Sequence, residues 1–209
     1  NCSNIDEACF LLYNTSIIGI KDNITNTIAP LHWIIVDSNG KCLILENRED
    51  GMHLLLNPIG VLTNSPNLEW HITNLRNYMN LSPIQYNESR WEKIYLTPFG
   101  QGAGLIGLPG DFTPPSRFVR AAFLKSHVEI PNNKNEAIIT YFHIMESVSI
   151  PKGIVVTSSG KNDYTQYTSF MDLKNCEYFI KTYNNTQIHS QKLRAISEIN
   201  KIIEIEKIK

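Results

Sequence analysis

Asn64 is the first residue whose type and position suggest chemistry. It follows directly on the apolar run Gly60 to Thr63, which we expect to be a strand, and it precedes Ser65. Its side-chain amide should therefore project from a strand end, where binding and catalytic residues are often placed. Asparagine is also a common turn residue whose amide satisfies the turn backbone. The residues alone leave both interpretations open.

Arg117 is the second residue of this kind. It falls in the first turn of the helix that Thr113-Pro114-Pro115 should open, with threonine as the cap and proline at the first helical position. The helix dipole disfavours a cation there by about 0.3 kcal/mol or more, so the guanidinium needs a compensating partner. A salt bridge to Asp111 or another acid would supply one, and so would a role in a site.

Other familiar chemistries do not fit the sequence. Gly102 to Gly107 matches a dinucleotide fingerprint, but Leu108-Pro109-Gly110 breaks the helix that should follow, and no parallel strand precedes it. The six histidines lack metal-ligand spacing, and no Gly-x-Ser-x-Gly elbow is present. We therefore expect no cofactor and no metal. The four cysteines form no close pairs and are expected to be buried free thiols, at Cys2, Cys9, Cys42 and Cys176.

The composition is that of an ordinary soluble protein. The 209 residues are 42% hydrophobic and 19% charged, with a net charge of -1, so no basic excess points to nucleic acid or to an anionic membrane. No apolar run approaches the roughly 20 residues of a membrane-spanning helix. Without a linker or repeat, we expect one domain over residues 1–209, divided into a helix end and pocket loop (1–30), a core (31–190) and a tail (191–209).

The elements that must position Asn64 and Arg117 follow from hydrophobic periodicity and turn residues. A helix is expected over Asp6 to Tyr13, and a hairpin should turn at Ser38-Asn39-Gly40-Lys41. Further strands read as an antiparallel series. The expected strands are Leu31–Asp37, Cys42–Asn47, Met52–Leu56, Gly60–Thr63, Gly153–Thr157, Tyr164–Leu173 and Tyr178–Tyr183, with a hairpin turn at Lys174-Asn175-Cys176-Glu177.

Three further helices should pack on these strands. The first opens at Ser65-Pro66, with an apolar stripe of Leu68, Ile72, Leu75 and Met79. The second follows Thr113 and buries Phe118, Ala121, Ala122 and Leu124, and the third carries Ala137, Tyr141, Ile144 and Val148 and stops before Pro151. The tail from Leu193 to Lys209 fits a strand and a helix equally well.

Several longer motifs, in order along the chain, resemble the choloylglycine hydrolase family of penicillin V acylases and conjugated bile salt hydrolases. They span Leu31 to Ile188, and the most distinctive are Gly60-Val61-Leu62-Thr63-Asn64-Ser65-Pro66, Glu69-Trp70-His71, Phe99-Gly100-Gln101-Gly102-Ala103-Gly104, Gly107-Leu108-Pro109-Gly110-Asp111-Phe112-Thr113-Pro114 and Ser116-Arg117-Phe118.

The resemblance implies an α+β fold, the N-terminal nucleophile hydrolase sandwich of antiparallel sheets between helical layers. A cysteine at the N-terminus would attack a linear amide, its own amino group serving as base. Asn64 would hold the oxyanion, and the charge of Arg117 would favour the thiolate. Ile24, Ile28 and Leu31 would line the acyl pocket. A cytoplasmic homo-oligomer, a tetramer in the family, is implied, acting on a small amide such as penicillin V or a conjugated bile salt.

The family's N-terminal cysteine, and the arginine and aspartate after its first strand, find no match in this sequence. Cys2 is followed by Ser3 to Glu7, which read as a cap and helix start rather than a strand. We therefore expect a C-terminal portion that is inactive alone, with the nucleophile supplied by a missing segment. The alternative is a non-catalytic remnant or interaction module of the same fold.

Overall fold

The computed structural model describes residues 2–21, 26, 28 and 31–193. These residues group into two compact units, one from Asn1–Gly19, Ile34–Leu43 and Glu129–Lys209 and the other from Ile20–Trp33 and Ile44–Val128. The strands pair in the orders β1-β2-β3, β10-β9-β8, β4-β5 and β6-β7. Most of the tail predicted from Leu193 onward lies outside the described residues.

The first unit opens with helix α1, Ile5–Tyr13, where a helix was predicted. Asn4 caps it by accepting a hydrogen bond from the Glu7 backbone N–H at 2.9 Å, and the Glu7 carboxylate accepts one from Ser3 N–H at 2.7 Å. This reciprocal arrangement is a capping box. The predicted hairpin is confirmed in strands β1, His32–Val36, and β2, Cys42–Arg48, whose residues are divided between the two units. Gly40 at its turn has φ +80°.

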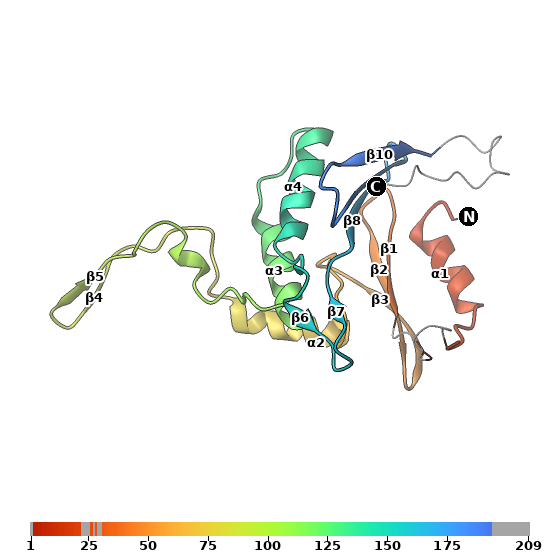
Figure 1. Ribbon diagram of the computed structural model, residues 1–209, viewed down its shortest axis with the longest axis horizontal. Helices are drawn as coiled ribbons and strands as arrows, with labels where there is room; N and C mark the ends of the chain where they lie inside the picture. The colour runs from red at the N-terminus through yellow and green to blue at the C-terminus, as the bar shows by residue number, and fades with distance from the viewer. Residues whose placement is uncertain (1, 22–25, 27, 29–30, 194–209) are drawn as a thin grey trace. The chain divides into compact units, whose positions relative to one another are not determined.

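The same unit contains helix α4, Lys134–Glu146, packed against an antiparallel sheet. The sheet consists of β8, Tyr167–Asp172, β9, Glu177–Thr182, and β10, His189–Lys192, and lies beside α4 in Figure 1. Their core joins Ile138, Phe142 and Phe179, with Tyr141 and Phe170 against it. The predicted β8–β9 hairpin is confirmed. A short pair, β6 (Val155–Val156) with β7 (Asn162–Asp163), completes the unit.

The second unit is built on strand β3, Gly51–Leu56, helix α2, Leu68–Asn74, and helix α3, Pro114–His127. A 3-10 turn over Leu75–Tyr78 extends α2. The predicted buried face of α3 is confirmed at three of its four positions, and α3 packs against α2. The fully buried side chains of this unit include Ile44, Leu68, His71, Phe118 and Val119.

Two sequence predictions around Asn64 are wrong. Gly60 to Thr63 form no strand, because the Asn57 side chain bonds this backbone instead, accepting from the N–H groups of Ile59 and Gly60 and donating to Val61 O. Helix α2 begins after Asn67, whose side chain accepts from Trp70 N–H at 3.0 Å, so Ser65 is not the cap. The Ser65–Pro66 bond is cis.

The apolar stripe predicted for this helix is also too long. Leu68 is buried, but Met79 lies beyond both α2 and the 3-10 turn, and its side chain is 82% exposed. The helical repeat therefore stops one turn earlier than the spacing of Leu68, Ile72, Leu75 and Met79 indicated.

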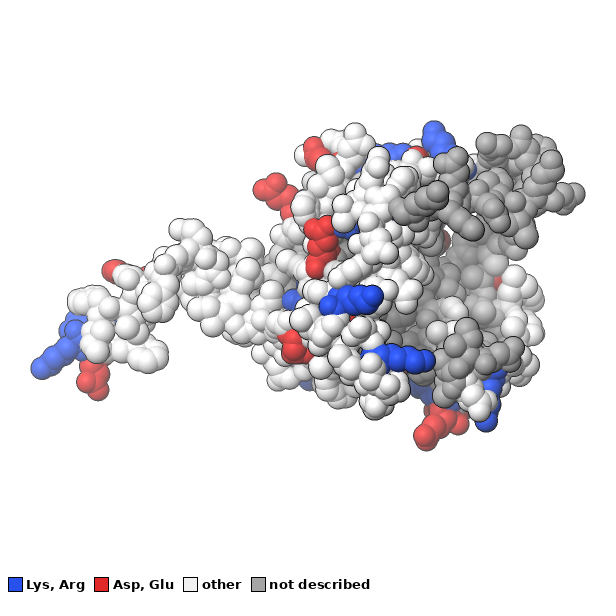
Figure 2. All heavy atoms as spheres, in the orientation of Figure 1, with Lys and Arg blue, Asp and Glu red and all other residues white. Residues whose placement is uncertain are grey.

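Residues 83–102 form a projecting segment of the second unit, which we call the arm. It carries the hairpin of β4, Ser89–Trp91, and β5, Ile94–Leu96, and extends away from α2 and α3 (Figure 1). In Figure 2 most of its visible surface is uncharged, with charged side chains gathered near the hairpin end. A single 3-10 turn, Ala103–Leu105, follows it. This turn replaces the helix that a dinucleotide site would need.

At the base of the arm, Ser82 N–H donates to Gly104 O at 3.0 Å. A Cβ on Gly104 would lie 2.2 Å from Ile84 O, so only glycine fits there.

The part of the chain that the structure describes contains no helix able to cross a membrane. Within it, no group of three or more metal-binding side chains comes together. No disulfide links the four cysteines, but only Cys42 is buried. The prediction of buried thiols is therefore wrong for Cys2 and Cys176, which are exposed because they lie before α1 and in the β8–β9 turn.

Candidate active site

Asn64 and Arg117 are 53 residues apart in the sequence and are joined by a hydrogen bond. One terminal nitrogen of the guanidinium donates to Asn64 Oδ1 at 2.8 Å. Because a guanidinium can only donate, the amide oxygen must face Arg117. The Nδ2 donors of Asn64 therefore point elsewhere. The side chain is exposed, so these donors can reach a ligand.

Arg117 lies in the first turn of α3, as the sequence predicted, and its side chain contacts two oxygen acceptors. Besides the bond to Asn64, its Nε donates to Phe112 O at 3.1 Å. The two contacts use different nitrogens of the guanidinium and fix its plane. Both acceptors, a backbone carbonyl and a side-chain amide oxygen, are uncharged.

Asp111, the acid considered as a partner for Arg117, is held by the start of α3. Its carboxylate accepts from Thr113 N–H at 2.9 Å, from Thr113 Oγ1 at 2.5 Å and from Ser116 Oγ at 2.6 Å. The hydrogen bonds from Ser116 and then Thr113 lower the pKa of Asp111 from 3.8 to about 2. An ionised carboxylate before the first turn offsets the partial positive charge of the helix N-terminus.

Arg120 secures the loop that leads into α3. It is buried, and one terminal nitrogen donates to Pro109 O at 2.7 Å and to Asp111 O at 2.6 Å. Burial lowers the pKa of this guanidinium, although Asp111 opposes the shift. Arg120 was not predicted as a site residue, because an arginine three positions after Arg117 has the pattern of an ordinary solvent-facing charge.

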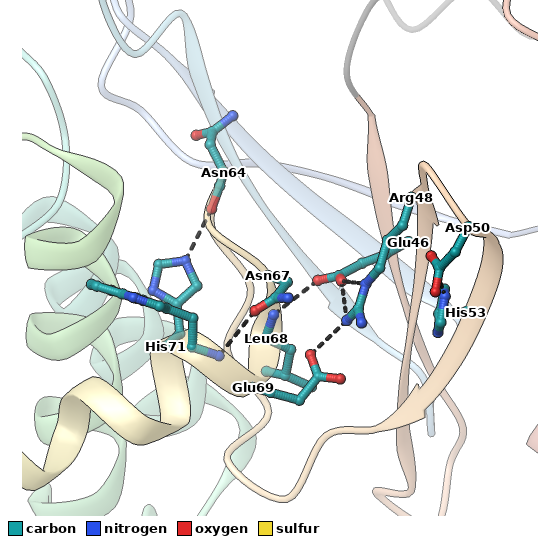
Figure 3. Close-up of polar contacts among 10 residues, drawn as sticks. Glu46, Arg48, Asp50, His53, Asn64, Asn67, Leu68, Glu69 and His71 are labelled. Carbon is teal, nitrogen blue, oxygen red and sulfur yellow. Dashed lines mark hydrogen bonds and ion pairs between the residues drawn. The ribbon is translucent and has the colours of Figure 1, made fainter.

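His71 contacts the backbone of Asn64 and was also not predicted as a site residue. Its side chain is 1% exposed and stacks on Phe118 with ring centroids 4.5 Å apart and planes 10° apart. Its Nε2 is 3.0 Å from the backbone oxygen of Asn64, as Figure 3 shows. Since a carbonyl only accepts, Nε2 carries the proton.

The N-terminus of α2, which carries His71, is held by a buried carboxylate. Glu46 on β2 is 3% exposed and accepts from the Leu68 backbone N–H at 3.0 Å. It also accepts from Arg48 at 2.6 and 2.8 Å, and Arg48 reaches on to Glu69 at 2.5 Å (Figure 3). Glu69 raises the pKa of Arg48, and Arg48 lowers that of Glu69. The buried charge is thus fully paired.

Two of the three predicted acyl-pocket residues lie among the described residues. Ile28 and Leu31 both have exposed side chains, and Ile24 lies outside the described residues. Exposed isoleucine and leucine side chains could contact an apolar ligand, but their role stays a prediction.

The fold matches that of known hydrolases. A crystal structure of a conjugated bile acid hydrolase variant from Clostridium perfringens superposes with a TM-score of 0.82 at 39% identity, covering 92% of this chain and 59% of that one. Penicillin V acylase from Agrobacterium tumefaciens shares the fold, with a TM-score of 0.68 at 21% identity over 92% of this chain and 52% of that one. The predicted fold class, that of the N-terminal nucleophile hydrolases, is confirmed.

The family model of the linear amide C–N hydrolases, choloylglycine hydrolase family, matches residues 1–200, and the chain belongs to that family. It is 43% identical to the bile salt hydrolase/transferase of Clostridium perfringens over 193 residues, which are 91% of this chain and 58% of that protein. Conjugated bile acid hydrolase from Lactobacillus acidophilus is 34% identical, over 92% of this chain and 61% of that protein. The chain thus spans about three fifths of these relatives.

Proposed function

We propose that in the full protein Asn64 and Arg117 assist a cysteine nucleophile, carried outside residues 1–209, in hydrolysing a linear amide. The observation that carries this proposal is the Arg117–Asn64 hydrogen bond. It fixes the Asn64 amide with its oxygen occupied and its N–H groups available, which is the arrangement an oxyanion donor requires.

The reaction would proceed through an acyl-enzyme. The cysteine thiolate adds to the amide carbonyl carbon, and the oxygen that becomes negative accepts a hydrogen bond from Asn64 Nδ2. The C–N bond then breaks, the amine takes a proton and leaves, and water hydrolyses the thioester to the acid. The positive charge of Arg117 favours the thiolate over the thiol, and its hydrogen bond keeps the amide in place.

Conjugated bile salts are the substrates we propose. Relatives from Clostridium perfringens, Lactobacillus acidophilus and Lactobacillus gasseri, at 33–43% identity, are named as bile salt or conjugated bile acid hydrolases, whereas the penicillin V acylase of Pectobacterium atrosepticum is 26% identical. The amide in such a substrate joins a bile acid to an amino acid, so hydrolysis would release both.

The test is steady-state hydrolysis of a glycine-conjugated bile salt and of penicillin V by the full-length protein. Asn64→Ala should lower kcat by about 10²- to 10³-fold, the usual effect of losing one oxyanion donor, and change KM much less. Cys2→Ala should leave kcat unchanged. Activity of residues 1–209 alone that survives Cys2→Ala would contradict a nucleophile outside this chain, and an Asn64→Ala variant as active as the wild type would contradict the role of the amide.

We also propose that the two units belong to one domain and that the full protein is a cytoplasmic homo-oligomer. Three of the cysteines, Cys2, Cys9 and Cys176, are at least partly accessible without forming disulfides with other described residues, which suits a reducing compartment. The arm supports self-association because several large apolar side chains on it are exposed, and exposed apolar patches mark contact surfaces. They include Ile84, Trp91, Ile94, Tyr95 and Phe99.

A further inference from the structure

His71 makes a hydrogen bond to Asn64 and a ring stack on Phe118, the neighbour of Arg117. Its Nε2–H group bonds the backbone oxygen of Asn64 at 3.0 Å and lies 3.3 Å from Thr63 Oγ1. Its ring stacks on Phe118, the residue next to Arg117 in the first turns of α3. One buried ring therefore touches both the segment that presents Asn64 and the helix that presents Arg117.

The segment before Asn64 depends on such contacts because no strand supports it. Residues 60–63 make no ladder hydrogen bonds, and the Asn64 side chain is exposed. Thr63 Oγ1 donates to Pro114 O at 3.2 Å, which ties the same segment to the start of α3. The bonds from His71 to Asn64 O and from Thr63 to Pro114 O therefore hold this backbone on either side of the Thr63–Asn64 peptide.

A purely stabilising role does not explain a histidine at this position. His71 Nδ1 is buried and has no hydrogen-bond partner among the described residues. An unsatisfied buried polar atom lowers stability, and a phenylalanine ring would fill the same space against Phe118 without one. The polar function that remains for the imidazole is the Nε2–H bond toward Asn64.

We propose that His71 is a positioning residue for the oxyanion amide. Its hydrogen bond holds the Asn64 backbone at a fixed distance from α3, so that Arg117 can bond Asn64 Oδ1. The Arg117 bond in turn directs Nδ2 toward the oxyanion. This inference rests on the proposed function for its effect on the reaction, but the geometry it describes can be measured without any substrate.

The test compares His71→Phe with His71→Gln in the full-length protein. Phenylalanine keeps the stack on Phe118 and removes the donor, whereas the glutamine amide nitrogen can occupy the place of Nε2 and keep the donor without the ring. Positioning predicts that His71→Phe lowers kcat at least about tenfold with little change in KM, which is part of the 10²- to 10³-fold loss caused by removing an oxyanion donor. His71→Gln should recover most of kcat while melting at a lower temperature than His71→Phe. A role in packing alone predicts the opposite order of kcat.

His127→Phe is the matched control. His127 also stacks on a phenylalanine, Phe123, with ring centroids 4.1 Å apart, and its Nδ1 is 2.8 Å from the Phe123 carbonyl oxygen. It makes the same two kinds of contact away from Asn64 and Arg117, so its replacement should leave kcat unchanged.

Crystal structures of the wild type and both His71 variants give a readout that is independent of activity. The Arg117–Asn64 Oδ1 bond should be lost or lengthened beyond hydrogen-bonding distance in His71→Phe and kept in His71→Gln. The proposal is overturned if the bond is intact in His71→Phe, or if that variant keeps kcat within twofold of the wild type. If the wild-type protein hydrolyses neither substrate, the proposed function fails, and the three structures still decide whether His71 positions Asn64.

Discussion

At the level of single residues, the site depends on which atom of Asn64 faces Arg117. The amide has one acceptor and one donor end, and only the acceptor end can meet a guanidinium. Arg117 thereby fixes the orientation of the amide as well as contributing positive charge. The two roles can be separated, because fixing the orientation of the amide needs a planar group that donates from two nitrogens, whereas supplying positive charge does not.

Arg117→Lys separates them. Lysine keeps the charge, but a single ammonium cannot hold both Phe112 O and Asn64 Oδ1 in the geometry that the guanidinium uses. We expect kcat to fall at least about tenfold, part of the 10²- to 10³-fold loss caused by removing an oxyanion donor, while the pH dependence of kcat/KM keeps its acidic limb. Wild-type kcat in this variant, measured on a conjugated bile salt, would mean that charge is the whole contribution of Arg117.

Asn64 and Arg117 could be named from the sequence as candidate site residues because their family motifs and helix position are local features. His71, Arg120 and Glu46 could not, since their significance depends on long-range contacts and burial. Glu46 reads as one polar residue at the end of an apolar run, yet it reaches Leu68, 22 residues further along the chain. Hydrophobic patterning predicts which side chains are buried, but it does not predict which buried polar groups satisfy one another.

At the level of elements, helix α2 is the part that connects the core to Asn64. Two side chains bond the backbone N–H groups of its first turn, Asn67 from the cap position and Glu46 from strand β2. Glu46 provides a tertiary contact that fixes where α2 starts, whereas Asn67 is a local cap. Replacing Glu46 should therefore destabilise α2 more than replacing the exposed Glu69 does.

Glu46→Ala and Glu69→Ala test this difference. Both remove a carboxylate that bonds Arg48, but Glu46 is 3% exposed and the Glu69 side chain is 54% exposed. Glu46→Ala leaves the Leu68 N–H unsatisfied and should lower the free energy of unfolding by about 3 kcal/mol. Glu69→Ala should cost no more than about 1 kcal/mol. Urea denaturation followed by circular dichroism measures both, and equal losses would show that burial of Glu46 is unimportant.

Elements with a clear period were predicted well, and those that depend on side-chain bonding were not. The helices α1, α3 and α4 and the hairpins at Gly40 and Cys176 followed from apolar spacing and turn residues. The strand expected before Asn64 is missing because Asn57 bonds its backbone. Strand β10 was not predicted because its sequence, His189–Lys192, is polar, and its pairing with β9 comes from the backbone.

At the level of the whole molecule, the exposed apolar side chains of the arm are unusual for a monomeric protein. Trp91 on β4 is 71% exposed and Phe99 is fully exposed, and both line a cavity of 560 Å³ in the second unit. Large apolar side chains left in water lower solubility and favour association. Family resemblance supplied the expectation of an oligomer, and composition alone could not have done so.

Replacing Trp91 and Phe99 together by serine should reduce the molar mass of the full-length protein in solution, because the apolar contact that the arm would make is removed. Size-exclusion chromatography with light scattering measures that mass. Ile139→Ser on α4, also at an exposed apolar side chain, is the control and should leave the mass unchanged. A double variant with the wild-type mass would exclude the arm as the contact between subunits.

The closed base of the arm has a consequence for protein engineering. Gln85 bridges the two ends, accepting from Ala103 N–H and donating to Gly100 O, and Gly104 brings its backbone against that of residues 82 and 84. These contacts lie outside residues 86–99, and doubling the length of a flexible loop costs only about 0.6 kcal/mol. We therefore expect that residues 86–99 can be replaced by a shorter linker or a foreign peptide while the helices that carry His71 and Arg117 stay folded.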